Sequence, residues 1–333
     1  MTRFASLRLS ICAAAVIAAV ALAAPGPAAA QGQNLTKLKI VVFDFPSLGA
    51  FMPPVIKAKK FDEANGLDLT FDDRPPTAYT TQFNSGEYKV GGSAALLTVG
   101  LADLRGVKVK YLFNLFDYWG GAVTSRPAIK TVKDLEGKEL AGARATTNYQ
   151  MFEFFAKKLG ADVSKYKVVN TATPGLVGYA MADRADAVQL WEPAYTILKA
   201  KKADIRLLDL QLDKTWKSFA GGSAIPYLGI AAHTDWIEQN PDAVKKLYAA
   251  YKAAADYIVK NPADAAKIID PKGTPDEQAA VVGLIKANER LGMNVKPAGE
   301  MKKEIEAVYK AGMDVGYLKS MPSNDTIYDK PLQ

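Results

Sequence analysis

The chain of 333 residues carries a formal net charge of +7, one cysteine and one histidine. Its basic residues occur in short pairs such as Lys59-Lys60 rather than in one block, which argues against nucleic acid as a partner. One cysteine and one histidine argue against a metal site built from these ligands, and the length predicts two lobes rather than a single core.

Residues 1–30 are typical of a secretory signal peptide. Arg3 and Arg8 precede an apolar run from Leu9 to Ala24, and Ala28-Ala29-Ala30 offers the small residues that a signal peptidase needs. The run has 16 residues, fewer than the roughly 20 of a membrane-spanning helix. We therefore predict export to the periplasm, with cleavage near Ala30.

Cleavage there would also remove the cysteine. Cys12 lies early in the apolar run and follows the bulky Ile11, which argues against a lipid-attachment site. The loss of Arg3 and Arg8 lowers the formal net charge from +7 to +5. The exported chain then has no thiol, so its stability must come from the burial of its core.

Residues 38–118 alternate short β-branched or aromatic runs with helical patterns. The predicted strands are residues 38–43, 67–71, 88–91 and 107–113. The predicted helices are residues 53–64, 77–84 and 94–104, each followed closely by a glycine. This alternation predicts parallel β-α-β units with helices on both faces of a sheet.

The alternation restarts after residue 120 and ends in a helical tail. The predicted strands are residues 121–125, 139–143, 166–170, 185–190, 205–208 and 227–232. The predicted helices are residues 131–135, 148–159, 174–182, 193–201, 241–260, 275–290 and 300–316, with a further helix beginning at Pro262. We expect the tail to pack on the first lobe, so that residues 31–118 and 223–333 form lobe 1 and residues 119–222 form lobe 2.

Polar groups follow two predicted strands at the start of a helix. Gly91-Gly92-Ser93 precedes the helix expected from Ala94, and Thr146-Thr147-Asn148 opens the helix expected over residues 148–159. The backbone N–H groups and hydroxyls in such places bind an anion or polar ligand group, or they cap the helix. Both interpretations stay open, and they are compatible.

Aromatic and acidic residues gather after three other predicted strands. These are Asp44 and Phe45, then Phe116, Asp117, Tyr118 and Trp119, and finally Trp191 and Glu192. At strand ends the rings could stack on a flat ligand while the carboxylates accept its N–H or hydroxyl groups. The alternative is that they pack the hinge and the edges of the lobes.

No pattern predicts catalysis. His233, directly after the last predicted strand, is better interpreted as a surface or capping residue than as a general base. The sequence has no glycine-rich nucleotide motif after a strand, no HExxH and no GxSxG. We predict no catalytic residue, no metal and no cofactor.

Four segments in the right order resemble one family of binding proteins. Residues 133–141 resemble its "DLKGKKIA" segment, and residues 83–91 resemble "L-x-SGE-x-DVG". Residues 179–193 resemble "AL-x-x-G-x-VDA…WEP", with Asp183-Arg184 where a glycine is usual, and residues 240–266 resemble "NPE…NP-x-EAA-x-I". Over nearly all of its exported part, the chain is similar to the nitrate/sulfonate/taurine-type periplasmic solute-binding proteins of ABC transporters, which include binders of thiamine-pyrimidine precursors.

The resemblance implies the type II periplasmic binding protein fold, with two α/β lobes, a hinge and a ligand between the lobes. It implies a monomer that binds a small molecule and delivers it to an inner-membrane permease with its ATPase. It also implies that ligand contacts come from Asp44 and Phe45, from Ser93 and Ala94, from Phe116 to Trp119, and from Thr146 to Asn148.

The cargo and two other functions stay open. A sulfonate needs converging donors, for which Arg74, Arg126 or Arg144 are candidates, whereas the aromatic loops suit a pyrimidine, a flavin or an aromatic acid. Related enzymes that build the thiamine pyrimidine use a cysteine-rich motif, which residues 31–333 lack. A ligand sensor on the same fold is the other alternative.

Overall fold

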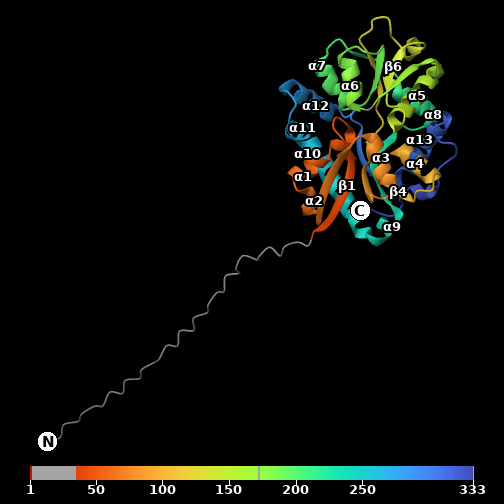
Figure 1. The fold of residues 1–333 in the computed structure, drawn as a ribbon. Coiled ribbons are helices and arrows are strands. Elements are labelled where there is room, and N and C mark those ends of the chain that lie inside the picture. Colours follow the sequence, from red (N-terminus) through yellow and green to blue (C-terminus); the bar gives the residue numbers. More distant parts are fainter. Residues whose placement is uncertain (2–34, 172, 333) are drawn as a thin grey trace. The chain divides into compact units, whose positions relative to one another are not determined.

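The computed structural model describes Met1 and residues 35–171 and 173–332, and from Leu35 onward the chain folds around two β-sheets (Figure 1). The predicted signal peptide, apart from Met1, lies outside the described residues. We call the six-stranded sheet with its helices the first lobe and the five-stranded sheet with its helices the second lobe. The predicted two-lobed α/β fold is confirmed.

The first sheet has the strand order β11-β4-β10-β3-β1-β2. Its strands are β1 (Thr36–Phe43), β2 (Leu67–Arg74), β3 (Val90–Ala95), β4 (Val109–Asp117), β10 (Pro226–His233) and β11 (Met293–Pro297). β1 pairs in parallel with β2 and β3, whereas β10 is antiparallel to both of its neighbours, β3 and β4. Because β10 and β11 come from the last third of the chain, the first lobe is built from two separate stretches of sequence.

The second sheet has the strand order β7-β6-β8-β5-β9. Its strands are β5 (Gly121–Thr124), β6 (Glu139–Gly142), β7 (Lys167–Asn170), β8 (Ala187–Leu190) and β9 (Arg206–Leu207). β6 is parallel to β7 and β8, but β5 is antiparallel to β8 and β9. Both sheets are therefore mixed, and the expectation of parallel units holds only for one side of each sheet, for β3, β1 and β2 in the first and for β7, β6 and β8 in the second.

Nine described helices accompany the first sheet and four accompany the second (Figure 1). Those of the first lobe are α1 (Pro53–Ala58), α2 (Phe61–Ala64), α3 (Pro76–Asn84), α4 (Leu96–Leu104), α9 (Thr234–Gln239), α10 (Pro241–Lys260), α11 (Pro262–Ile269), α12 (Pro275–Ala287) and α13 (Lys302–Asp314). Those of the second lobe are α5 (Thr147–Lys158), α6 (Thr173–Met181), α7 (Ala194–Lys201) and α8 (Leu212–Ala220).

The helical tail packs on the first lobe, as predicted. α10 buries Val244, Leu247, Tyr251 and Ile258 on one face and contacts α1, α2 and β2, because apolar residues at three- and four-residue spacing fall on one side of a helix. α13 contacts α4. The tail also reaches the second lobe, since α12 contacts α7 and α13 contacts α5.

One predicted helix was wrong in extent, and two elements of the structure, β11 and α8, were not predicted. The helix expected over residues 53–64 is broken into α1 and α2 at Lys60, whose φ of 56° is left-handed and cannot continue a helix. β11 was missed because its edge position needs only a half-buried, mixed sequence. α8 was missed because it buries only Trp216 among its residues.

Two strands are longer than predicted, and this changes the interpretation of candidate residues. β3 continues to Ala95, four residues beyond its expected end, because Gly92 lets Ile40 and Val42 approach the backbone closely. β4 continues to Asp117, because β10 and β11 pair with it along that length. Ser93, Ala94, Phe116 and Asp117 are therefore strand residues and not loop residues.

Two segments cross side by side between the lobes. The first is the short link from β4 to β5, and the second leads from α8 back to β10. A hydrogen bond joins them, in which the backbone N–H of Tyr118 donates to the carbonyl of Ile225 over 2.7 Å. The first link also contacts α5, because Asn148 Nδ2 donates to the carbonyl of Trp119 over 3.1 Å.

Candidate functional site

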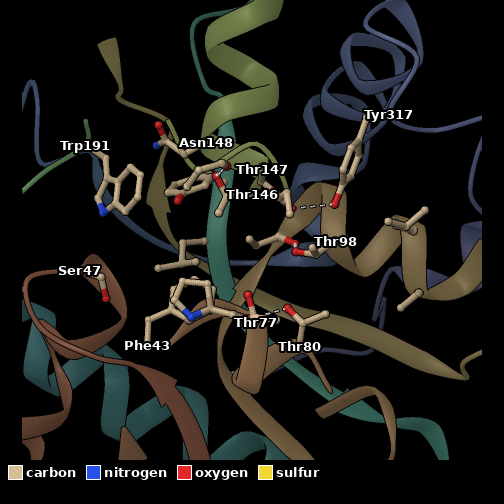
Figure 2. A pocket seen from close by; sticks show the side chains of 18 of the residues that line it. Phe43, Ser47, Thr77, Thr80, Thr98, Thr146, Thr147, Asn148, Trp191 and Tyr317 are labelled. Atoms are coloured by element: carbon tan, nitrogen blue, oxygen red, sulfur yellow. Dashed lines mark hydrogen bonds between the residues drawn. The ribbon is translucent and has the colours of Figure 1, made fainter. Parts of the chain in front are cut away.

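A cavity of about 530 Å³ lies between the lobes (Figure 2). Its walls include the residues that directly follow or end five strands, namely Phe43 of β1, Ala95 of β3, Ala143 after β6, Asn170 of β7 and Trp191 after β8. Ligands of open α/β sheets bind outside the carboxyl ends of the strands. The cavity is where the two sheets place such ends opposite each other, and its volume suits a small molecule.

Three helices begin at this cavity. The residues that open α3, α4 and α5, including Thr77, Ala95 and Thr147, line its wall. The first N–H groups of a helix have no partner in the helix, and the helix dipole adds positive charge there. The converging termini favour a negatively charged group in the cavity.

Of the three helix N-termini, that of α5 is the best arranged to bind a ligand. Its N-cap is Thr146, whose hydroxyl accepts from the N–H of Tyr149 over 3.2 Å and donates to the carbonyl of Ala143 over 2.8 Å. Within residues 35–171 and 173–332, no oxygen accepts from the N–H of Thr147 or of Asn148. These two N–H groups are available to a ligand.

Two buried hydroxyls in the wall also lack a hydrogen-bond partner among the described residues. Thr147 is 1% exposed and Ser47 is 4% exposed, and the Oγ atom of each is unbonded. Leaving a buried polar group unsatisfied costs about 1–3 kcal/mol, so such groups call for an explanation. Polar groups of a ligand in the cavity would satisfy both, because Ser47 lines it from the first lobe and Thr147 from the second (Figure 2).

Two aromatic residues complete the inner part of the cavity. Phe43 comes from the first lobe and Trp191 from the second, and Trp191 lies on the same side of the view in Figure 2 as Ser47. Phe43 is held by an edge-to-face contact with Tyr79, with ring centroids 4.7 Å apart. Their faces provide an apolar contact for the body of a ligand.

Four of the thirteen predicted site residues line the cavity: Thr146, Thr147, Asn148 and Trp191. The side chain of Asn148 already has partners, since it donates to Trp119 and its Oδ1 accepts from Gln189 Nε2 at 2.5 Å. Asn148 therefore offers the cavity its backbone N–H, while its side chain positions the link between the lobes.

Ser93 and Ala94 do not line the cavity, because both are buried in β3. The Ser93 hydroxyl accepts from the N–H of Phe43 over 2.8 Å and so fixes the end of β1 against β3. Asp44 and Phe45 also lie outside the lining, although their neighbours Phe43 and Ser47 belong to it. Burial raises the pKa of the Asp44 carboxyl, and the nearby Asp73 adds to this effect.

Four more predicted residues, Phe116 to Trp119, lie outside the lining of the first cavity. Phe116 is in the core, edge to face with Phe51. Asp117, Tyr118 and Trp119 line a second cavity, of about 880 Å³, beside the crossing segments. For these residues the hinge-packing alternative describes the structure better than stacking on a ligand in the first cavity.

Glu192 is fully buried and paired with Arg290 of the first lobe, with 2.8 Å between Arg290 Nε and Glu192 Oε1. Its other oxygen accepts from the N–H of Thr196 over 3.0 Å. Burial raises the pKa of Glu192, and Arg290 opposes that effect. The residue joins the lobes and does not line the ligand cavity.

Asp117 gives the protein a predictable dependence on pH. Burial raises its pKa from 3.8 to about 6, although hydrogen bonds from Asn294 and Asn114 act in the opposite direction. The folded state therefore binds a proton more readily than the unfolded state, so this group makes the protein less stable as pH rises from about 4 to about 6. The loss amounts to about 3 kcal/mol at most.

We expect Asp117→Asn to remove this contribution. Urea unfolding at a series of pH values should show a flatter pH dependence for the variant than for the unchanged protein between about pH 4 and pH 6. The control is Asp213→Asn, which changes an exposed carboxyl in the second cavity and should keep the pH dependence of the unchanged protein. The same dependence of stability on pH in all three proteins would contradict the raised pKa of Asp117.

Sequence reasoning missed most of the polar wall of the first cavity. Part of this wall is one polar face of α3, made of Thr77, Thr80, Thr81 and Asn84. Their spacing of three, one and three residues, which places them on one helix face, was already visible in the sequence. Tyr227 and Tyr317 also line the cavity. The signal was the polar stripe on α3, whereas nothing in the sequence showed that Tyr227 and Tyr317, far along the chain, come to the same place.

The part of the chain that the structure describes has neither a metal-binding cluster nor a membrane-spanning helix. No group of three or more His, Cys, Asp or Glu side chains in that part of the chain could hold a metal ion. Within the same part, no helix has both the length and the apolar composition to cross a membrane. His233, at the end of β10, makes a 2.6 Å hydrogen bond through Nε2 to the carbonyl of Phe83 and does not line the first cavity.

Residues 55–265 match the family described as NMT1/THI5 like. A binding protein of Brucella abortus (strain 2308) is 23% identical over 144 residues, which cover 42% of each protein. The chain thus spans less than half of the length of the curated relatives that it matches.

Solved structures share the fold at low sequence identity. The alkanesulfonate-binding protein SsuA from Xanthomonas axonopodis pv. citri, bound to MOPS, has a TM-score of 0.73 and 16% identity over 88% of this chain and 98% of that one. The periplasmic aliphatic sulphonate binding protein SsuA from Escherichia coli has a TM-score of 0.67 and 14% identity over 87% and 96%. These similarities concern the arrangement of the two lobes.

Proposed function

The chain belongs to the NMT1/THI5-like family, and we propose that it is the periplasmic solute-binding component of an ABC importer that captures a small organic acid between its lobes. The observation that carries this proposal is the start of α5, with two free N–H groups and the buried, unpartnered hydroxyl of Thr147 at the cavity. Such a site binds an oxyanion with little rearrangement, because its donors are already in place.

The charges of the wall support an acid over a neutral or cationic solute. Of the lining residues that the structure describes, Arg105 alone carries a charged side chain. A sulfonate or a carboxylate would gain from the three helix termini, whereas a neutral pyrimidine would leave the donors at α5 without a charged acceptor. The fold shared with SsuA, whose Xanthomonas structure contains MOPS, is in accord with an acidic ligand that carries a ring.

The transport cycle that we propose uses the predicted lobes as moving units, residues 31–118 with 223–333 and residues 119–222. The protein is exported, its signal peptide is cleaved near Ala30, and it acts as a monomer. Ligand contacts from both lobes favour the closed state, and the closed face is presented to an inner-membrane permease with its ATPase. The solute is released unchanged, so the protein is a carrier and not an enzyme.

A thermal-shift screen of residues 31–333 tests the proposal directly. The panel contains MOPS, pentanesulfonate, benzoate and the neutral 4-amino-5-hydroxymethyl-2-methylpyrimidine. A ligand that binds only the folded state raises the melting temperature in proportion to the logarithm of its concentration over Kd. We expect at least one acid to do so. Stabilisation by the neutral pyrimidine alone would contradict the proposal.

Thr147→Val should weaken the binding of that acid about tenfold or more. The change keeps the shape of the side chain and removes only the buried donor, and a hydrogen bond to a charged group contributes about 1.5–3 kcal/mol. Calorimetric titration with the stabilising acid measures the effect. The control is Thr80→Val in the same cavity, whose hydroxyl already donates to the carbonyl of Pro76 over 2.9 Å. Equal losses in both variants would mean that the Thr147 hydroxyl has no special role.

A further inference from the structure

The cavity continues away from the start of α5 as a groove between α3 and α4. On α3 the lining positions after the first turn are Thr80, Thr81 and Asn84, and on α4 they are Thr98, Leu101, Ala102 and Arg105. The positions on α4 follow the spacing of three, one and three residues that marks one helix face, and α3 shows the same spacing from Thr77 onward. Both helices therefore line the space over their whole length.

The length of this groove follows from the helices that bound it. α3 and α4 each contain nine residues, so each is about 13 Å long. Both begin at the inner cavity, where α5 also begins, and both end at the outer part of the groove. A ligand group held at the helix N-termini and a second group at the outer end would be separated by about 7 Å, after a hydrogen bond of about 3 Å at each end.

The outer end of the groove is chemically different from its middle. The middle has the apolar side chains of Leu101 and Ala102, and the threonine hydroxyls there donate to carbonyls of their own helices, as Thr98 does to Ala95 over 2.6 Å. The end has the guanidinium of Arg105 and the amide of Asn84. Arg105 makes no ion pair within the part of the chain that the structure describes, so its charge is available to a ligand.

Tyr317, which follows α13 in the first lobe, lines the cavity beside the start of α5. Its ring lies opposite Trp191 across the view in Figure 2, and its hydroxyl donates to the carbonyl of Ala145 over 3.2 Å. Burial raises the pKa of the Tyr317 phenol, and the positive charge of Arg105, which lines the same cavity, opposes this effect. Tyr317 thus joins the first lobe to the residue before the N-cap of α5, and Arg105 supplies the positive charge at the far end of α4.

We propose that the ligand is an extended diacid, with one acid group at the N-termini of α3, α4 and α5, an apolar spacer along α3 and α4, and a second acid group at Arg105. This rests on the proposed function and adds the chemistry of the far end of the ligand. A monoacid would fill the inner site and leave Arg105 without an anion. Linear and aromatic spacers both fit the apolar middle of the groove.

The test compares diacids with monoacids of the same skeleton, suberate with octanoate and terephthalate with benzoate, by calorimetric titration. We expect at least one diacid to bind the unchanged protein about tenfold more tightly than its monoacid partner. Arg105→Met keeps the aliphatic stem and removes the charge. It should abolish this preference by weakening the diacid alone. Lys108→Met, at an exposed cation outside the lining, is the control and should keep the preference.

Two results would overturn the proposal while leaving the proposed function intact. One is that both monoacids bind as tightly as their diacids, and the other is that the preference survives in Arg105→Met. The failure of all four compounds to bind, in a protein that also fails to respond to MOPS and pentanesulfonate, would instead refute the proposed function, and the diacid assignment with it. Binding of the sulfonates without any preference for a diacid refutes only the assignment.

Discussion

Replacing Gly229 with alanine is expected to lower the free energy of unfolding by about 3 kcal/mol, as overpacking at a backbone contact does. A Cβ atom at this position of β10 would lie 2.2 Å from the carbonyl oxygen of Phe113 and 2.4 Å from the hydroxyl of Tyr111. The first contact is with the backbone of β4, which cannot rotate away. The strands must separate at a point where their register already shifts.

The same change should reach the ligand cavity. Tyr227 and Leu228, the two residues before Gly229, line its wall. Urea unfolding measures the loss of stability, and titration with an acid that binds measures the weaker affinity. Gly222→Ala is the matched control, since no atom lies within 4 Å of its added Cβ, and it should change neither quantity. A stable Gly229→Ala protein with unchanged affinity would show that the strands adapt at no cost.

The alternation of apolar runs and helices was enough to predict the fold. Apolar periodicity is a local property, and it located most strands and the long helices, including the buried face of α10. Sheet order was not accessible in this way. The insertion of β10 between β3 and β4 depends on contacts between residues more than a hundred positions apart, which no local pattern encodes.

The site was predicted only in part, because its prediction depended on strand ends. At α5 the end of β6 was placed within one residue, and Thr146, Thr147 and Asn148 line the cavity. At β3 the end was placed four residues too early, so Ser93 was taken for a loop residue although it is buried between strands. An error of a few residues at a strand end moves a side chain from a ligand site into the core.

Acidic residues were a second source of error. Glu192 follows a strand and precedes a proline, which made it a candidate for contact with a ligand. Its actual partner, Arg290, lies almost a hundred residues later in the turn before β11, an element that the sequence did not reveal. A buried carboxylate needs a partner, but the sequence alone cannot say which cation provides it.

Arg290→Ala is expected to destabilise the protein by about 3 kcal/mol, because it leaves the fully buried Glu192 without its cation. The guanidinium also lies 5.6 Å from the ring centre of Tyr195 and 5.9 Å from that of Trp119, and these contacts would be lost as well. Urea unfolding measures the effect. Lys252→Ala, which removes an ion pair exposed on both sides, is the control and should cost no more than about 0.5 kcal/mol.

The cost of Arg290→Ala should depend on pH and on Glu192 itself. Burial already raises the pKa of Glu192, and without Arg290 it rises further, so the folded variant takes up a proton that the unfolded chain binds less readily. Its stability should therefore fall as pH rises above the pKa of the unfolded carboxyl, and its deficit should be larger at about pH 8 than at about pH 5. In a Glu192→Gln background no charge is left unpaired. There, removing Arg290 should lower the free energy of unfolding much less, and the loss should not depend on pH.

An equal loss of stability in both backgrounds would mean that Arg290 acts through its packing on Trp119 and Tyr195. A smaller loss in the Glu192→Gln background would identify the buried ion pair between Glu192 and Arg290 as the contact that joins the lobes next to Trp191.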